Sequence, residues 1–349
     1  MNSQNAFAIR WLEQGLVPDR LARLGIRRLL AQRLKEVHSG DAAAAAELTH
    51  AFAQSLHAAP LALHADLANA QHYELAAAFF ERVLGPRLKY SCCLWDEDGD
   101  WSLAQAETAA LVSTCARAQL SDGQDVLELG CGWGALSLWM AEHYPASRIT
   151  ALSNSASQRA FIEARARARG LENLRVVTRE FSDFDAPFGH YDRVVSVEMF
   201  EHLRNWPRAF ARVARWLRPG GLFFLHVFAH REAPYCFKVR DASDWMSQHF
   251  FTGGMMPSDD LPLYFQDHLR LVQRWRWDGR HYARTARAWL GNMDAHRDAL
   301  LPIVQAGHGG AGELWWMRWR LFFMAVEELF DWNEGQQWWI GHYLLEPRA

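Results

Sequence analysis

The amino-acid sequence predicts an α/β fold in which helices cover both faces of a mostly parallel sheet. The first observation is the alternation of helical patterns with short apolar runs between residues 106 and 227, which is typical of parallel sheets. The second is a glycine-rich turn over residues 128–134, between an apolar run and a helical pattern. The third is size, because 349 residues that are 50% hydrophobic and 22% charged can form a substantial core.

Residues 1–83 are predicted to form a helical cap, because Leu21, Leu24 and Leu34 recur at helical spacing and residues 42–46 are all alanine. Up to residue 35 there are seven arginines and lysines against two acidic residues. A basic amphipathic helix can lie on an anionic membrane. Because the apolar stripe is modest, we favour a packed helix with a solvated basic face.

The elements from residue 106 onward follow from apolar periodicity and from glycine and proline breaks. Helices are expected over 106–119, 135–143, 157–169 and 206–216, and strands over 126–129, 149–152, 174–177, 193–197 and 222–227. Ligands of such sheets bind at the carboxyl ends of the strands. We therefore expect the functional residues at those ends.

The regular alternation stops after Val227. Residues 228–262 are irregular, and long irregular insertions in compact domains are usually functional, so we predict a lid insertion over about 228–290. The catalytic part of the chain would then cover residues 84–349. Residues 338–345 read as a strand that could join the sheet edge. Nine of the 17 tryptophans lie between Trp275 and Trp339; we expect core positions, with the lining of an aromatic or cationic ligand as the alternative.

The composition argues against several classes of protein. The cysteines are odd in number and form no Cys-x-x-Cys pair, so we expect a reducing compartment, no disulfide framework and no metal site. A net charge of -3 gives no general reason to expect nucleic acid. No signal peptide and no membrane-spanning run are visible, which favours a cytoplasmic protein.

The glycine-rich turn has the spacing Glu-x-Gly-x-Gly-x-Gly, with Glu128 followed by Gly130, Gly132 and Gly134. Glycines let a ligand approach the backbone, and the following helix presents free amides at its N-terminus. The dinucleotide pattern is Gly-x-Gly-x-x-Gly. The different spacing favours S-adenosylmethionine (SAM) over NAD as the cofactor, with a loop that binds no ligand as the alternative.

Three titratable residues, Glu198, Glu201 and His202, follow directly after the apolar strand that ends at Val197. Such a cluster behind a buried strand predicts a catalytic or binding role. The alternative is a helix N-terminus with acidic residues in its first turn, which is common.

Together, residues 90–93, 128–134, 200–202 and 217–221 resemble the class I methyltransferases related to cyclopropane fatty acid synthases. The nearer branch is that of coclaurine N-methyltransferase and other tetrahydroisoquinoline N-methyltransferases. The resemblance to that branch runs almost end to end, from residues 15–18 through 88–93, 197–202, 250–254, 263–267 and 281–285.

This resemblance implies a Rossmann-like fold with a seven-stranded, mostly parallel sheet, an N-terminal helical cap and an inserted lid. It also implies a SAM site in which Tyr90 and Ser91 hold the methionine carboxylate and Ser153 and Gln158 meet the ribose. The full cofactor set is Tyr90, Ser91, Glu128, Gly130, Gly132, Gly134, Ser153, Asn154, Gln158, Glu180, Phe181 and Val197, with Glu180 and Phe181 beside the adenine.

By the same resemblance, Glu201 and His202 are the catalytic pair, and Glu198 stabilises a substrate ammonium in the pocket. An amine nucleophile is mostly protonated near neutral pH, so such an enzyme needs a nearby base or carboxylate. The lipid-modifying branch instead binds a bicarbonate ion, whose ligands would be Cys92, Glu201, His226 and Tyr282.

Two features favour an amine over a lipid as the methyl acceptor. Glu198 stands where lipid-modifying relatives usually have glycine, and a carboxylate is costly beside an acyl chain. Residues 252–254 and 281–285 also resemble the N-methyltransferases. We therefore predict a SAM-dependent N-methyltransferase for a small aromatic amine, with a cyclopropane-fatty-acyl-phospholipid synthase as the alternative. A catalytically inactive scaffold and a nucleic acid methyltransferase are disfavoured, and the resemblance also suggests a homodimer.

Overall fold

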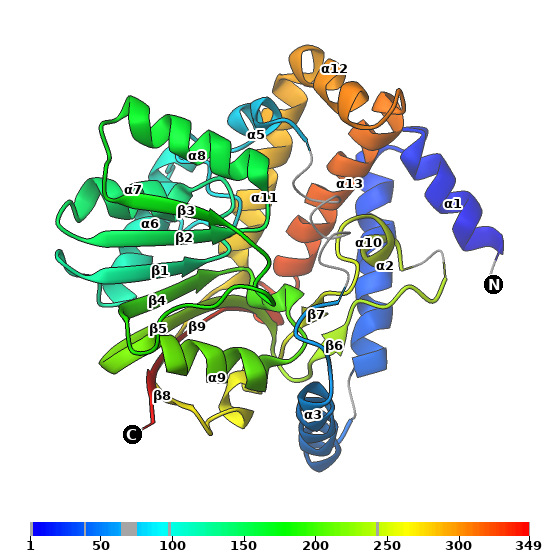
Figure 1. Ribbon diagram of the computed structural model, residues 1–349. Coiled ribbons are helices and arrows are strands. Elements are labelled where there is room, and N and C mark those ends of the chain that lie inside the picture. Colours follow the sequence, from blue (N-terminus) through cyan, green and yellow to red (C-terminus); the bar gives the residue numbers. More distant parts are fainter. Residues whose placement is uncertain (1–2, 38–39, 64–74, 97–98, 242–243, 349) are drawn as a thin grey trace.

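The computed structural model describes residues 3–37, 40–63, 75–96, 99–241 and 244–348. Its centre is a seven-stranded sheet with the order β3-β2-β1-β4-β5-β9-β8 (Figure 1). The strands are β1 Asp125–Leu129, β2 Arg148–Ser153, β3 Leu174–Thr178, β4 Tyr191–Val197, β5 Leu217–His230, β8 Leu269–Trp277 and β9 Trp338–Pro347. The predicted α/β fold class with a seven-stranded sheet is therefore confirmed.

Strands β1 to β5 are parallel, and β9 runs antiparallel to both of its neighbours, β5 and β8. The prediction that residues 338–345 join the sheet edge is wrong in position, because β9 lies between β5 and β8. The edge strand is β8, which the sequence did not reveal. Its central residues are mostly exposed or half-buried and include four that are polar or charged, so it lacks the apolar run of a buried strand.

Helices cover the sheet on both faces. Helices α6 Leu103–Arg117 and α7 Ala135–His143 pack on one face, and α9 Trp206–Trp216 packs on the other. Successive residues of one strand go to opposite cores: Val126 packs with α6 and α7, whereas Leu127 packs with α9. Helix α8, Ala156–Ala168, follows β2. This two-sided burial explains the continuous apolar runs of the central strands.

The N-terminal region is helical, as predicted, but interrupted. It consists of α1 Ser3–Glu13, α2 Asp19–Val37, α3 Ala42–His57 and α5 Ala77–Val83. Residues 58–63 are not helical, and part of the expected cap, residues 64–74, lies outside the described residues. No described helix is long and apolar enough to cross a membrane.

Only part of the apolar stripe of α2 faces the core, as Leu34 does, whereas Leu21 and Leu24 are 57% and 60% exposed. Helix α2 also turns a basic residue toward α13, Gly312–Phe330, where Arg23 pairs with Glu327 at 2.7 Å and with Glu328 at 2.8 Å. Part of the basic face is therefore used inside the molecule.

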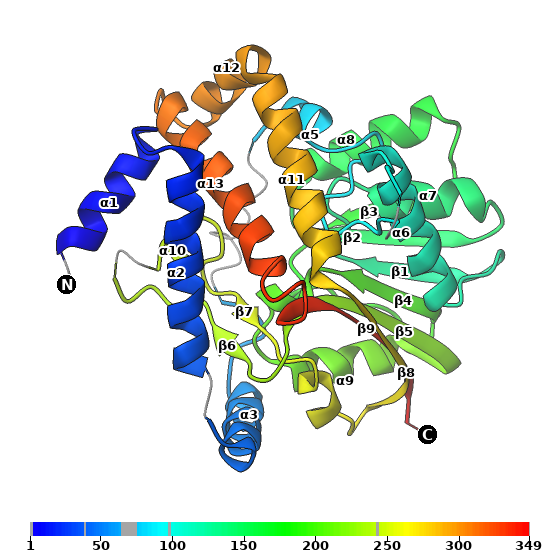
Figure 2. The same cartoon turned by 180° about the vertical axis from the view of Figure 1, so that it is seen from behind.

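The C-terminal helices α11 Gly279–Ala295, α12 Arg297–Gly307 and α13 Gly312–Phe330 pack beside the sheet together with α2 and α5 (Figure 2). Trp289, Trp319 and Trp338 are almost fully buried in their shared core, as expected for core tryptophans. That core also contains Phe79 and Phe80 of α5. The packing is thus continuous across residue 83, and the division into a cap and a catalytic domain stays a prediction.

The predicted lid range contains short elements only in its first part. They are β6 Tyr235–Cys236, α10 Trp245–His249, β7 Met255–Met256 and the 3-10 turn Leu261–Tyr264. The range up to residue 290 is too long for a lid, because residues 269–277 form β8 of the sheet and residues from 279 onward belong to α11. In Figure 1 the arrowheads of β1, β2 and β3 point toward the helical half of the molecule.

Candidate active site

A cavity opens at the carboxyl ends of the parallel strands. Its walls contain most of the predicted site residues: Tyr90, Ser91, Glu128, Gly130, Gly132, Ser153, Asn154, Gln158, Glu180, Phe181, Val197, Glu198 and His202. Cys92, Gly134, Glu201, His226 and Tyr282 are not among the residues that line it. The position agrees with the rule that ligands of such sheets bind at the carboxyl ends of the strands.

The three glycines of the turn after β1 have different tasks, although all have positive φ angles. At Gly132, with φ +50°, an added Cβ atom would have no protein atom within 4 Å, so the backbone is open to the cavity. At Gly130 it would meet the Met199 side chain at 2.6 Å, and at Gly134 the Ile162 side chain at 2.6 Å. Gly132 therefore allows ligand approach, whereas Gly134 allows α7 and α8 to pack closely.

Polar groups at the end of β2 present a donor to the cavity. Ser153 Oγ donates to Gln158 Oε1 at 2.7 Å, and Asn154 Nδ2 donates to Glu180 Oε1 at 2.7 Å. Gln158 Nε2 is buried and has no partner among the described residues. A buried donor without a partner in a cavity wall is costly unless a ligand satisfies it. Together with the open backbone at Gly132, these residues fit a SAM molecule, whose ribose hydroxyls accept hydrogen bonds.

Glu128 is the acidic residue of the turn motif and lies in β1, 3% exposed. Ser137 Oγ donates a hydrogen bond to it. Burial raises the pKa of Glu128 to about 7, against the lowering effect of that hydroxyl. Its charge is therefore sensitive to pH near neutrality.

Lys89 is a site residue that the sequence reasoning missed. It is 3% exposed, lines the cavity, and its Nζ donates to Ser91 Oγ at 2.6 Å and to the Cys92 carbonyl at 2.5 Å. A buried ammonium is rare unless several acceptors satisfy it. The available signal was that Lys89, directly before Tyr90 and Ser91, is the one charged residue in the stretch 88–95.

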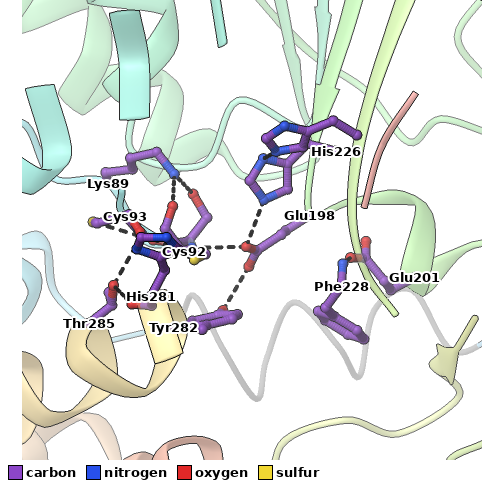
Figure 3. Close-up of polar contacts among 12 residues, drawn as sticks. Lys89, Cys92, Cys93, Glu198, Glu201, His226, Phe228, His281, Tyr282 and Thr285 are labelled. Atoms are coloured by element: carbon purple, nitrogen blue, oxygen red, sulfur yellow. Dashed lines mark hydrogen bonds and ion pairs between the residues drawn. The ribbon is translucent and has the colours of Figure 1, made fainter. Parts of the chain in front are cut away.

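The carboxylate of Glu198 receives three hydrogen bonds, which Figure 3 shows converging from different directions. The Cys92 N–H donates to Oε1 at 2.9 Å, and the Tyr282 hydroxyl donates to Oε2 at 2.7 Å. His226 Nε2 lies 3.2 Å from Oε1. The structure thus brings Cys92, His226 and Tyr282 together, as the resemblance implies, but around Glu198.

The backbone conformation of Glu198 sets the direction of its carboxylate. Glu198 follows β4 with φ +50°, a left-handed conformation that is uncommon for residues with a Cβ atom, and its N–H donates to the His226 carbonyl at 2.9 Å. Strained residues of this kind cluster at functional sites. Burial raises the pKa of Glu198, while the ammonium of Lys89 and the Cys92 and Tyr282 donors oppose the rise.

Glu201 lies in the 3-10 turn Phe200–His202, and this turn directs its side chain away from the Glu198 cluster (Figure 3). Its Oε1 accepts from the Phe228 N–H at 2.8 Å, and its Oε2 has no partner among the described residues. Burial, and then the neighbouring charge of Glu198, raise the pKa of Glu201 well above its usual value. Both effects therefore favour the neutral form of Glu201. The predicted place of Glu201 in the Cys92–His226–Tyr282 group is not observed.

His202 lines the cavity and stacks on Phe251, with ring centroids 4.7 Å apart and an interplanar angle of 27°. Burial lowers the pKa of His202 to about 4, although the charge of Glu198 opposes the change. The imidazole is thus neutral near pH 7 and can accept a hydrogen bond. Among the described residues, no group of three or more His, Cys, Asp and Glu side chains could hold a metal ion.

The sheet order, the open glycine turn and the buried polar cluster behind β4 define a class I methyltransferase that uses SAM, as the sequence predicted. The chain belongs to the mycolic acid cyclopropane synthetase family, whose model matches residues 64–337. The predicted family resemblance is thereby confirmed.

Relatives within the family include an (S)-coclaurine N-methyltransferase from Thalictrum flavum subsp. glaucum, 34% identical over 97% of this chain and 95% of the relative. The cyclopropane-fatty-acyl-phospholipid synthase of Escherichia coli K12 is 33% identical, over 63% of this chain and 54% of the relative. A crystal structure of coclaurine N-methyltransferase bound to N-methylheliamine and SAH is similar with a TM-score of 0.93 and 34% identity, covering 97% of this chain and 98% of that one. The match to the N-methyltransferases thus includes the helical part of the chain.

Proposed function

We propose that the protein transfers a methyl group from SAM to the nitrogen of a small aromatic amine of the tetrahydroisoquinoline or phenethylamine type. The observation that carries this proposal is the position of the Glu198 carboxylate, between the Cys92 N–H, the His226 ring and the Tyr282 hydroxyl. The relatives that match almost the whole chain are named as N-methyltransferases of such amines, which supports the same acceptor class.

The Glu198 carboxylate supports the amine branch because of what it replaces. The resemblance to the lipid-modifying enzymes assigns Cys92, His226 and Tyr282, together with Glu201, to a bicarbonate ion. Here the donors on these three residues hold the chain's own carboxylate instead, so the negative group at this point is part of the protein. A buried carboxylate attracts an ammonium substrate, whereas it is unfavourable beside an acyl chain.

The cofactor residues have positions that suit their predicted roles. Gly132 would allow SAM to lie close to the backbone, Gln158 Nε2 would donate to its ribose, and Glu180 and Phe181 lie in the wall where an adenine would sit. When bound, SAM supplies an electrophilic methyl group that an amine nitrogen takes with its lone pair. Tyr90, Ser91 and Lys89 line the part of the cavity proposed for the methionine end.

We assign proton removal to Glu198. The nitrogen must lose one proton for each methyl group that it gains, and a buried carboxylate with a raised pKa is a better base near neutral pH than an exposed one. The proton passes from nitrogen to a Glu198 oxygen. His202, neutral and in the same wall, would accept a hydrogen bond from the substrate and orient it. Glu201, neutral and outside the wall, would support the turn by holding the Phe228 N–H.

A direct test compares two sets of acceptors with SAM under identical conditions. One set contains tetrahydroisoquinolines and phenethylamines, and the other contains unsaturated phospholipid vesicles, each with and without added bicarbonate. Fragment masses must locate the added carbon, because both reactions add one CH₂ overall. Methylation on nitrogen, independent of bicarbonate, is the expected result. Modified acyl chains without N-methylation would overturn the proposal in favour of the lipid branch, which the family's description and the Escherichia coli relative make the second candidate.

Two further expectations, the cytoplasmic location and the homodimer, remain proposals. All five cysteines are free, which supports a reducing compartment such as the cytoplasm. The homodimer stays a prediction, to be measured by light scattering of the purified protein, and nucleic acid is not proposed as a partner.

A further inference from the structure

A chain of hydrogen-bonded side chains leads from Glu198 across the sheet, through two buried histidines, to the half-buried Arg117 at the end of α6. Strand pairing places His226 of β5 directly opposite His342 of β9, and both side chains are 0% exposed. His342 Nε2 lies 2.9 Å from His226 Nδ1, and His226 Nε2 lies 3.2 Å from Glu198 Oε1. At the far end, Arg117 Nη1 bonds His342 Nδ1.

The chemistry of these groups fixes the direction of every hydrogen bond. A guanidinium only donates, so His342 Nδ1 must be the acceptor of the Arg117 bond. A neutral His342 then carries its proton on Nε2 and donates to His226 Nδ1. His226, also neutral, therefore carries its proton on Nε2 and donates to Glu198. Both histidines are neutral because burial lowers their pKa values well below the usual value, and for His342 the neighbouring His226 adds to this effect.

We propose that Arg117 and His342 are positioning residues for methyl transfer, which fix His226 in the tautomer that donates to the Glu198 carboxylate. Without them, His226 could place its proton on Nδ1 and turn a lone pair toward Glu198. That arrangement would disfavour the ionised carboxylate and misalign it. The role rests on the proposed function, in which Glu198 is the base.

The surroundings support a dedicated arrangement. Arg117 lies over the rings of Trp275 and Trp277, at 5.3 Å and 5.4 Å from their centroids, and no ion pair with a carboxylate is found for it among the described residues. The Trp277 ring also packs edge-on against both histidines, with centroid distances of 4.4 Å to His342 and 5.6 Å to His226. The Trp277 ring thus covers both histidines, whose side chains are fully buried, and their hydrogen bonds are shielded from water.

Other charged or titratable groups act on the same sites and must be considered in any pH measurement. Lys89, His202, Cys92 and Tyr282 surround Glu198, and Glu201 is electrostatically coupled to it. Lys89 and Arg117 act on the two histidines. Apart from Arg117, none of these groups belongs to the hydrogen-bond chain from Glu198 to Arg117. Removing His342 therefore leaves their charges in place.

The hydrogen-bond chain from Glu198 to Arg117 cannot carry protons away from the site. Arg117 cannot accept a proton, so a proton that Glu198 takes from the substrate does not leave through His226 and His342. It must leave on the cavity side. The chain therefore orients the base and does not conduct protons.

The test compares His342→Leu, which removes the donor to His226, with His342→Gln, which keeps an amide donor at a similar distance from the backbone. For His342→Leu we expect kcat to fall about tenfold near pH 7 and the acidic limb of its pH profile to move up by about one unit, since one pKa unit is a factor of ten. KM for the amine and the affinity for SAM should stay unchanged, and His342→Gln should restore most of the loss. Arg117→Met should give a smaller shift of the same sign, with Arg117→Lys closer to wild type.

Arg87→Met serves as the matched control. Arg87 lies over the Trp139 ring at 4.8 Å, as Arg117 lies over its tryptophans, but it pairs with Glu142 and, among the described residues, forms no hydrogen bond with Glu198 or the two histidines. An equal loss of kcat at every pH in His342→Leu, without a shift of the acidic limb, would reduce His342 to a structural residue and overturn the proposal.

Nitrogen-15 spectra of labelled histidines provide a readout that needs no turnover. Wild type should show His226 with its proton on Nε2, and His342→Leu should show a mixture of both tautomers; the His226 signals are assigned by comparison with His226→Gln. A wild-type His226 with its proton on Nδ1 would overturn the chain itself. Full activity of Glu198→Gln would instead show that Glu198 is not the base, and Arg117 and His342 would then have no role in positioning it. The nitrogen-15 spectra would still show whether His342 fixes the tautomer of His226. Failure of the proposed function and failure of the hydrogen-bond chain are therefore distinguishable.

Discussion

The two ends of the cavity are built in different ways. At the end proposed for the cofactor, the centre of the wall comes from the turns at the ends of β1 and β2, residues 128–134 and 153–158, and residues 89–91 and 180–181 complete it. At the acceptor end, one carboxylate, that of Glu198, is held by groups from three distant parts of the chain, Cys92, His226 and Tyr282. The centre of the proposed cofactor site is thus built from local turns, whereas the proposed acceptor site depends on contacts between distant parts of the chain.

The most direct test of the difference between the two ends of the cavity is to remove the charge of Glu198. In Glu198→Gln the shape is kept but the base is lost, so kcat should fall by about 10²–10⁴-fold, the usual contribution of a general base. The affinity for SAM, measured by calorimetry, should change little, because the cofactor end is built separately. Turnover within a few-fold of wild type would show that Glu198 is not the base.

The cofactor end is tested by Gly132→Val. A side chain at φ +50° is strained, and here it would project into the open space beside the cavity, so SAM affinity should fall by about a hundredfold or more. Gly189→Val is a matched control, since Gly189 has φ +60° and open space around it but lies outside the cavity wall. An unchanged affinity in Gly132→Val, measured by the same calorimetry, would contradict the assignment of the turn.

The two glutamates of the acceptor end can be separated by Glu201→Gln. A neutral Glu201 resembles glutamine in shape and charge, and the amide oxygen can still accept from the Phe228 N–H. We expect kcat to fall by less than about tenfold, in keeping with the loss of one neutral hydrogen-bonding group. A loss as large as that in Glu198→Gln would return the base to Glu201, as the resemblance to the family first implied.

The smallest expected effect concerns stability at the cofactor end. The pKa of Glu128 is raised from 4.5 to about 7 in the folded protein, so between these values the folded state binds more protons than the unfolded state. The free energy of unfolding of ligand-free wild type should therefore fall, relative to Glu128→Gln, as pH rises from 4.5 to about 7, and the difference should then level off. Urea unfolding at a series of pH values measures it; a constant difference would refute the raised pKa.

Much of the fold and of the cofactor end could be predicted from the sequence, because the information is local. The helices Ala135–His143 and Trp206–Trp216 have the predicted bounds, since an apolar pattern and a break at each end define them. The glycine-rich turn is also recognisable from the spacing of seven consecutive residues, 128–134. Edge strand β8 was missed because its exposed arginines and glutamine dilute the apolar pattern that marks buried strands.

The acceptor end could be predicted only in part. The sequence placed Glu198, Glu201 and His202 together, but side-chain direction depends on the positive φ at Glu198 and on the 3-10 turn that follows, and neither leaves a pattern in the residue types. The pairing of His226 with His342 depends on the register of β5 with β9, which joins segments more than a hundred residues apart. Such contacts follow from the tertiary fold, not from spacing along the chain.

The position of β9 has a consequence for how the enzyme is made. This strand comes after every other strand of the sheet in the sequence, yet it lies between β5 and β8, so β8 cannot join the sheet until β9 has been synthesised and inserted. Contacts of such long sequence separation form late because loop closure must precede them. A nascent chain can therefore complete the glycine turn while still on the ribosome, but the hydrogen bonds that we propose to align Glu198 form only once β9 is in place.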